Sequence, residues 1–158
     1  MTTPRPSFES IKVSDAPAPL VCGPVTRTHF VRYAGASHDF NPNHHDEVYA
    51  TANGNKAVFG MGMLAGGYCA RLLTDWLGHT ALQRLRIRFA SRFWPGDVLT
   101  CMAWVSAKRE VDGQGLVDCE FSAVNQAGEV IIRGDATAAL PRSSTSFTLD
   151  LPLPTLPA

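Results

Sequence analysis

Two side chains of this sequence could exchange protons with each other and with a water molecule. They are Asp39 and His44, which lie five residues apart on either side of an Asn-Pro turn. A carboxylate and a neutral imidazole both accept a proton and can return it, so a pair that converges on one water could remove its proton while its oxygen attacks a carbon atom. The alternative interpretation is structural: Asp39 caps the following turn and His44 only binds backbone groups.

Short helices on both sides should hold this pair in place. Thr26 or Thr28 can cap a first helix that continues to about Gly35. A second short helix is predicted to start near Asp46, whose charge suits the positive end of a helix, and to end by Gly54. The candidate pair therefore lies on the loop between the two helices.

The longest helix is predicted from about Gly62 to Leu77. Apolar residues recur there at helical spacing, few positions are charged, and Gly78 is a natural stop. A helix with so little polar surface should be buried in the core. Its first turn would offer an unpaired backbone N–H group and the positive end of the helix dipole to a ligand.

The rest of the chain predicts antiparallel strands: arginines alternate with apolar residues over 84–89, and residues 98–107 form a strand that is apolar on both faces. A polar turn at 110–115 separates two of these strands, and Asn125 to Gly128 joins the last two in a hairpin. The expected strands cover residues 84–89, 98–107, 116–124 and 130–140.

One buried helix followed by several strands is an α+β arrangement in which a curved antiparallel sheet wraps a single helix. One sheet covers only one side of that helix, so a second copy whose sheet continues the first is expected to complete a dimer. The predicted layout is an extended lead-in over residues 1–24, a single domain over 25–140 and a Pro/Ser/Thr-rich tail over 141–158.

The composition argues against several classes of protein. The 14 basic and 14 acidic residues balance to zero, which does not favour binding to nucleic acid or to an anionic membrane. No apolar stretch approaches the ~18 residues of a membrane span, and the N-terminus lacks the apolar core of a signal peptide, so we expect a cytoplasmic protein. The four cysteines are widely spaced, which is typical of reduced, buried thiols.

Residues 33–46 and 58–64 together resemble the MaoC-like (R)-specific enoyl-CoA hydratase family, which has the hotdog fold. The first segment, Y-A-G-A-S-H-D-F-N-P-N-H-H-D, is similar to the family signature Y-A-x-x-[ST]-G-D-x-N-P-[ILV]-H. The second, V-F-G-M-G-M-L, is similar to the A-H-G-M-L segment that follows. The likeness covers about residues 8–140, and its Asp-x-Asn-Pro-x-His core is the specific part.

The resemblance implies an activity and a set of roles. Asp39 and His44 would hold the water that adds across a trans-2-enoyl thioester to give an (R)-3-hydroxyacyl thioester. The backbone N–H of Gly62 would receive the thioester oxygen, and Asn41 would support the loop. Asn41, Met63 and Tyr68 are the candidate substrate-binding residues, although the helical spacing of Tyr68 favours a place in the core.

The family likeness also bears on partners and cofactors. The substrate would be a thioester of coenzyme A or of acyl carrier protein, with neither a metal nor an organic cofactor required. The assembly would be a homodimer, or a heterodimer with a homologue. Adjacent His44 and His45 would tend to point apart, which disfavours a metal site formed with His38, Asp39 and Asp46.

Three departures from the signature keep other functions open. His38 replaces a glycine, Asn43 an aliphatic residue and Met61 a common histidine. They allow a shifted substrate range or a non-catalytic subunit that pairs with an active homologue. A thioesterase would need a carboxylate on the long helix or a neighbouring strand, and Asp75 is the helix's only acid, near its far end. Two roles are considered for Arg84, Arg86 and Arg88: they either contact the phosphates of the carrier that bears the acyl group or form a solvated strand face.

Overall fold

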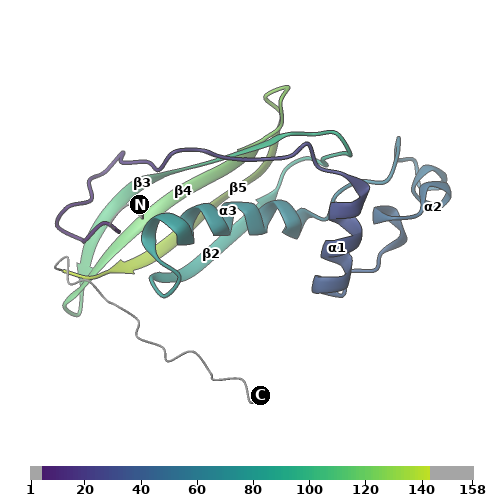
Figure 1. The fold of residues 1–158 in the computed structure, drawn as a ribbon. Helices are drawn as coiled ribbons and strands as arrows, with labels where there is room; N and C mark the ends of the chain where they lie inside the picture. The colour runs from purple at the N-terminus through teal and green to yellow at the C-terminus, as the bar shows by residue number, and fades with distance from the viewer. Residues whose placement is uncertain (1–4, 143–158) are drawn as a thin grey trace, which may run out of the picture.

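The computed structural model describes residues 5–142 and has an α+β architecture, as the sequence predicts. A five-stranded antiparallel sheet with the order β1-β3-β4-β5-β2 curves around one long helix, α3, which crosses one face of the sheet (Figure 1). The elements in chain order are β1 Leu20–Cys22, α1 Arg27–Ser37, a 3-10 turn Pro42–His44, α2 Glu47–Ala52, α3 Gly62–Leu77, β2 Leu82–Phe89, β3 Leu99–Val111, β4 Gln114–Val124 and β5 Val130–Leu140.

The three predicted helices are confirmed, the predicted cap at Thr26 is present, and Asp46, predicted near the start of the second helix for its charge, also caps it. Thr26 caps α1 by accepting a hydrogen bond from the backbone N–H of His29, and Asp46 caps α2 through the N–H of Tyr49. The long helix α3 has the expected bounds, and Gly78 follows it with a φ of 107°. The local signals of capping and periodicity therefore predicted where these elements lie.

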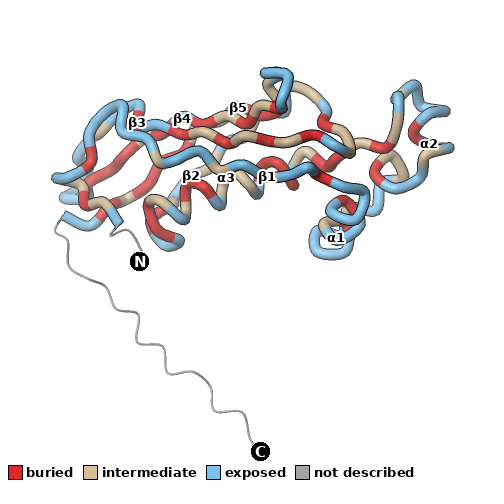
Figure 2. Tube along the Cα trace, turned by 45° about the horizontal axis from the view of Figure 1, so that its top comes forward, coloured by how far each residue is buried: buried red, intermediate tan, exposed pale blue. Residues whose placement is uncertain are grey.

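The core lies between α3 and the inner face of the sheet. Figure 2 shows buried positions facing one another along α3 and the central strands. The helix contributes Leu64, Ala65, Cys69, Leu72 and Leu73 to this core, and all five are buried. Because this burial removes apolar surface from water, it fixes the position of α3 across the sheet.

The strands confirm the predicted order but correct some of their bounds. Residues 110–115 form no six-residue turn, since β3 and β4 continue to a two-residue hairpin at Asp112 and Gly113. Both turn residues have positive φ values, 49° and 78°, as a tight hairpin of this kind requires. The hairpin between β4 and β5 at Asn125 to Gly128 agrees with the prediction.

The lead-in contains a strand that the sequence did not indicate. Residues Leu20–Cys22 form β1 and pair with Leu99–Cys101 of β3. Further upstream, the N–H of Ser14 donates to the carbonyl of Val105. The lead-in therefore lies along the domain, as expected, but part of it also extends the sheet by one short edge strand.

The predicted C-terminal tail falls almost entirely outside the described residues, since the structure describes nothing beyond Arg142. Among the helices within residues 5–142, none combines the length and the apolar character needed to cross a bilayer.

Candidate active site

The candidate site is built at one end of the molecule, where α1 lies beside the N-terminal end of α3 and α2 lies farther out, beyond α1 (Figure 1). The residue that ends α1 is His38, in a left-handed conformation with φ 58° and ψ 22°. This backbone state usually favours glycine, but histidine adopts it more readily than most residues. His38 therefore turns the chain into the loop that carries Asp39 and His44, although the family signature has glycine at this position.

Side-chain amides hold this loop in shape. The Oδ1 atom of Asn41 accepts hydrogen bonds from the backbone N–H of Asn43 at 3.1 Å and from its side-chain nitrogen at 3.0 Å. The Asn43 carbonyl in turn accepts the N–H of Phe59 at 3.2 Å, and its side chain accepts from Asn55 at 3.3 Å. Asn41 thus supports the loop, and polar contacts anchor position 43 where the signature has an aliphatic residue.

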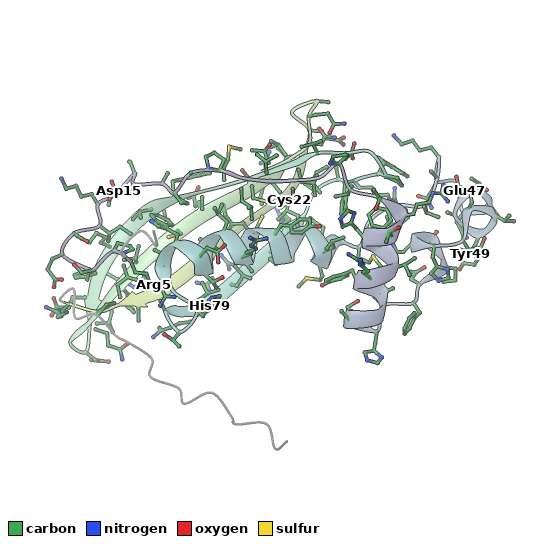
Figure 3. All side chains as sticks on the ribbon, in the orientation of Figure 1. Arg5, Asp15, Cys22, Glu47, Tyr49 and His79 are labelled. Carbon is green, nitrogen blue, oxygen red and sulfur yellow. The ribbon has the colours of Figure 1, made fainter. Side chains whose placement is uncertain are left out.

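A carboxylate at the start of α2 ties three segments together around the loop. Glu47, labelled in Figure 3, binds Arg27 of α1 at 2.6 Å and accepts the backbone N–H of Val58 at 3.3 Å. The segment that leads into α3 is therefore fixed to both short helices.

The imidazole of His44 is buried and held in one orientation. Its Nδ1 atom lies 2.7 Å from the carbonyl oxygen of Phe59. A carbonyl oxygen can only accept a hydrogen bond, so Nδ1 carries the proton and donates it. In the neutral ring, Nε2 then has a free lone pair. The ring of Phe59 packs edge-on against the imidazole with centroids 5.0 Å apart, which further restricts its rotation.

The free Nε2 of His44 faces the carboxylate of Asp39. The distance from Nε2 to Oδ2 is 3.6 Å, and the side chains are 8% and 44% exposed respectively. This separation is too long for a direct hydrogen bond, but a single water could lie within about 2.8 Å of both acceptors. The two residues that the sequence singled out are thus brought together, one buried and one reached by solvent.

The aromatic group beside His44 is braced by two cations. Phe59 contacts Trp94 with ring centroids 6.0 Å apart. Lys56 lies 4.4 Å from the centre of the Trp94 ring, and Arg92 lies 5.0 Å from the centre of the Phe59 ring. These cation–π contacts help to fix Phe59, whose carbonyl orients the imidazole. Sequence reasoning missed Phe59, because the group it contributes to the site is a backbone carbonyl.

The N-terminus of α3 provides a backbone donor near this pair. No side chain caps the helix at Met61, and within residues 5–142 the N–H of Gly62 has no hydrogen-bond acceptor. Gly62 is the third residue after Phe59, the anchor of His44, so the chain between them spans at most about 11 Å. The acid/base pair and the free N–H therefore belong to the same end of the molecule, joined through the short segment that follows Phe59.

Packing also accounts for a glycine at position 62. A Cβ atom at this position would lie 2.7 Å from two ring carbons of Phe89, the last residue of β2. The packing role and the proposed donor role of Gly62 are compatible. The residue makes room for the ring of Phe89, and its backbone N–H remains free at the start of the helix. The preceding residue, Met61, is fully buried.

Within residues 5–142, no hydrogen bond, ion pair or aromatic contact connects two of the predicted substrate-binding residues to Asp39 or His44. Met63 lies in the first turn of α3 and is half-exposed. Tyr68 faces the side of β1 and β3, where burial raises its pKa, with a smaller contribution from Cys22, labelled in Figure 3. Both remain proposals as substrate contacts.

Two alternatives considered from the sequence were a metal site around His44 and a thioesterase carboxylate at Asp75. Within residues 5–142, no three His, Cys, Asp or Glu side chains are placed to hold a metal ion. His45 contacts the carbonyl of Phe40 at 3.3 Å, whereas His44 contacts Phe59. Asp75 is exposed, pairs with Arg71 at 3.3 Å and lies 13 residues after Gly62, roughly 20 Å along α3. The geometry therefore offers Asp75 no part in the Asp39/His44 site.

Comparison with known proteins identifies the family. The sequence pattern of the family described as MaoC like domain matches residues 15–127. The chain belongs to the MaoC-like dehydratase family.

Curated relatives of this MaoC-like chain include parts of larger enzymes. It is 30% identical over 125 residues to fatty acid synthase 2 of Mycosarcoma maydis, covering 73% of the chain but only 3% of that protein. It is 30% identical over 103 residues to the 3-oxo-4,17-pregnadiene-20-carboxyl-CoA hydratase beta subunit of Mycobacterium tuberculosis, covering 65% of the chain and 77% of the relative. A mitochondrial 3-hydroxyacyl-[acyl-carrier-protein] dehydratase of Arabidopsis thaliana is 29% identical over 69% of the chain and 66% of its own length.

Solved structures confirm the hotdog fold. The R-hydratase PhaJ1 of Pseudomonas aeruginosa superimposes with a TM-score of 0.76 at 24% identity, covering 87% of this chain and 86% of the other. The ChsH1-ChsH2 complex of Mycobacterium tuberculosis gives 0.73 at 24% identity, with 82% and 98% covered. At these identities the likeness shows the fold, and the chemistry has to be inferred from the site.

Proposed function

We propose that this protein catalyses the reversible hydration of a trans-2-enoyl thioester to the (R)-3-hydroxyacyl thioester. The observation that carries the proposal is the 3.6 Å separation between Asp39 Oδ2 and His44 Nε2, with the imidazole held by the Phe59 carbonyl. Membership of a hydratase and dehydratase family supports the reaction class. The (R) configuration and the thioester substrate rest on the family resemblance.

The arrangement suits each part of the reaction. A water bound between Asp39 and His44 forms a bond from its oxygen to Cβ and gives one proton to the pair. The π electrons of the C=C bond move toward the carbonyl, so negative charge develops on the thioester oxygen. The pair then delivers one proton to Cα, and the sum is the addition of one water. Because two coupled groups titrate as a unit, the two proton steps are assigned to the pair.

The charge on the thioester oxygen needs a donor, and we assign this role to the N–H of Gly62. The group lies at the positive end of α3 and has no acceptor within residues 5–142. One preorganised donor of this type contributes about 2.7–4 kcal/mol to transition-state stabilisation. General acid–base catalysis by Asp39 and His44 would raise the rate by a further factor of about 10²–10⁴. Three groups of this chain thus supply the main requirements of a hydratase.

We further propose that the protein works as a dimer. β2 is an edge strand of the sheet, and α3 lies on one face only (Figure 1). A second copy paired at this edge would continue the sheet and cover more of the helix.

The test is turnover by the purified protein. Crotonyl-CoA should lose its enoyl absorbance in the presence of the protein alone, and Asp39→Asn or His44→Gln should lower kcat by about 10²–10⁴-fold. Asp46→Asn is a matched control, since Asp46 caps α2 and faces the N–H of Tyr49 rather than the pair. The proposal is refuted if the Asp39 and His44 variants turn over substrate as fast as the wild type.

A second candidate function is that of a non-catalytic subunit in a heteromeric hydratase. One relative is named a beta subunit, and the departures at His38, Asn43 and Met61 allow it. In that case the isolated protein would show no turnover, and activity would appear only after a homologous subunit is added. The Asp39→Asn variant would then leave the rate of the mixed assembly unchanged.

A further inference from the structure

A single carboxylate oxygen connects the two parts of the chain that supply the acid/base pair. Oε2 of Glu47 accepts a hydrogen bond from Arg27 at 2.6 Å and another from the backbone N–H of Val58 at 3.3 Å. Arg27 is the first residue of α1, the helix that leads into Asp39. Val58 lies one residue before the carbonyl group that holds His44. One oxygen atom thus bridges the helix before Asp39 and the segment that orients His44.

Three consecutive N–H groups of that segment are hydrogen-bonded. The N–H of Phe59 donates to the carbonyl of Asn43 at 3.2 Å, and the N–H of Gly60 donates to the carbonyl of Phe93 at 2.9 Å. Both of these acceptors are backbone groups, whereas the first N–H of the run donates to the side chain of Glu47. Among these three acceptors, Glu47 is therefore the one that a substitution can remove.

The exposure of this carboxylate indicates what kind of role it can have. The side chain of Glu47 is 43% exposed and that of Arg27 is 55% exposed. Exposed ion pairs contribute little to stability, because water screens the charges and two side chains lose their freedom. Within residues 5–142, no hydrogen bond or ion pair joins the Glu47 carboxylate to Asp39 or His44. Its effect on the pair therefore passes through the backbone.

The segment after Glu47 decides which nitrogen of the neutral imidazole carries the proton. The carbonyl of Phe59 lies 2.7 Å from Nδ1 of His44, and Nε2 then faces Oδ2 of Asp39 at 3.6 Å. The hydrogen bond made by one ring nitrogen sets the protonation of the other. If the carbonyl moves away from Nδ1, the form with the proton on Nε2 gains population. That proton would occupy the lone pair that the proposed addition of water requires.

We propose that Glu47 is a positioning residue: its carboxylate, held by Arg27, fixes the backbone at Val58 so that His44 keeps its proton on Nδ1. The kinetic part of this inference rests on the proposed hydratase function, whereas the tautomer of His44 can be measured without turnover. A misplacement of about 1 Å at a reacting group can cost about 10²-fold in rate. The two backbone hydrogen bonds of the segment remain in a Glu47 variant, so the expected loss in kcat is smaller, about tenfold.

The first test is the hydration of crotonyl-CoA by Glu47→Ala. This variant should show a kcat about tenfold lower than that of the wild type and a KM within about twofold of it. Glu47→Gln keeps an oxygen that can accept both hydrogen bonds, so it should retain at least about half of the wild-type kcat. Glu110→Ala is the matched control, because it removes an exposed glutamate that pairs with Arg142 near the end of β3.

The second test is nuclear magnetic resonance of the ring nitrogens of His44, whose chemical shifts distinguish the two neutral tautomers. The wild type and Glu47→Gln should carry the proton on Nδ1, whereas Glu47→Ala should show a mixture of both forms. The urea midpoint of Glu47→Ala should stay close to that of the wild type, since the ion pair is exposed. If that variant does not fold, Glu47→Leu replaces it, because leucine fills more of the same space and offers no acceptor.

The outcomes separate the positioning role from the proposed function. A wild type that does not hydrate crotonyl-CoA would end the proposed function, and the tautomer of Glu47→Ala would still decide the positioning role. That role is overturned if His44 of Glu47→Ala keeps the wild-type tautomer. It is also overturned if Glu110→Ala or Glu47→Gln lowers kcat as much as Glu47→Ala does.

Discussion

Replacement of Gly62 by alanine probes both the packing and the chemistry of the candidate site. The new Cβ atom would lie 2.7 Å from two ring carbons of Phe89 and 3.2 Å from a third. Carbon atoms prefer separations of about 3.5–4.0 Å, so one of the two groups must move. The Phe89 ring is 54% exposed at the edge of the sheet, which makes it the group that shifts rather than the helix backbone.

The expected change in stability is small. Alanine favours a helix by about 1 kcal/mol over glycine. A displaced ring loses part of the roughly 1.5–3 kcal/mol that full burial of a phenylalanine provides. These terms oppose each other, so the free energy of unfolding of Gly62→Ala should stay within about 1 kcal/mol of the wild type. A fold that is intact by this measure allows the kinetic effect to be interpreted.

The expected change in rate is large, because the methyl group and the displaced ring both lie beside the N–H assigned to the thioester oxygen. Loss of one such donor costs about 10²–10³-fold in kcat, which sets the upper limit for hydration of crotonyl-CoA by Gly62→Ala. Adding Phe89→Ala removes the obstacle, so the double variant should regain part of the rate. Gly67→Ala is the control, since no atom lies within 4 Å of its added Cβ.

Two results would contradict this reasoning. Equal turnover by the wild type and Gly62→Ala would show that the helix N-terminus takes no part in the reaction. A slow Gly62→Ala variant whose rate is not raised by Phe89→Ala would show that the ring is not the cause of the loss.

Three further predictions concern stability, measured by urea unfolding. Gly134→Ala should cost about 3 kcal/mol or more, because its Cβ would lie 2.2 Å from the Arg86 carbonyl oxygen and 2.2 Å from the Phe121 ring; a loss below about 1 kcal/mol would contradict this packing. Asp97→Ala should cost about 1–3 kcal/mol, since this buried carboxylate accepts a backbone N–H at 2.8 Å and a side-chain amide at 3.0 Å; an unchanged midpoint would exclude that role. Burial raises the pKa of the Cys119 thiol from 9.0 to about 11, so the unfolded thiol ionises first as the pH rises. Stability should therefore fall between about pH 9 and pH 11 by up to about 2.7 kcal/mol, and Cys119→Ala should fall less over the same range.

The elements that sequence reasoning placed correctly are those whose signals are local. α3 shows its bounds in a period of apolar residues and a closing glycine, and α1 and α2 show theirs in the caps Thr26 and Asp46. The strand β5 was also placed at its observed bounds, because a hairpin turn precedes it and a proline follows it. The proximity of Asp39 and His44 followed from their spacing across one turn.

The features that were missed depend on partners distant in sequence. β1 is three residues long, and the hydrogen bonds that define it are made with β3, about 80 residues later in the chain. The contact between Phe89 and Gly62 joins the end of β2 to the start of α3, and neither residue type predicts it. The Phe59 carbonyl that orients His44 could not be predicted from side chains, since every residue carries that group.

The three departures from the family signature are all accommodated by the backbone and by packing. His38 adopts the left-handed conformation that glycine would take, Asn43 anchors the loop through hydrogen bonds, and Met61 is buried in the core. None of them separates Asp39 from His44 or covers the start of α3 with a cap. The pairing of Asp39 with His44 on which the proposed addition of water rests is therefore present, and this supports the proposed catalytic function over that of a non-catalytic subunit.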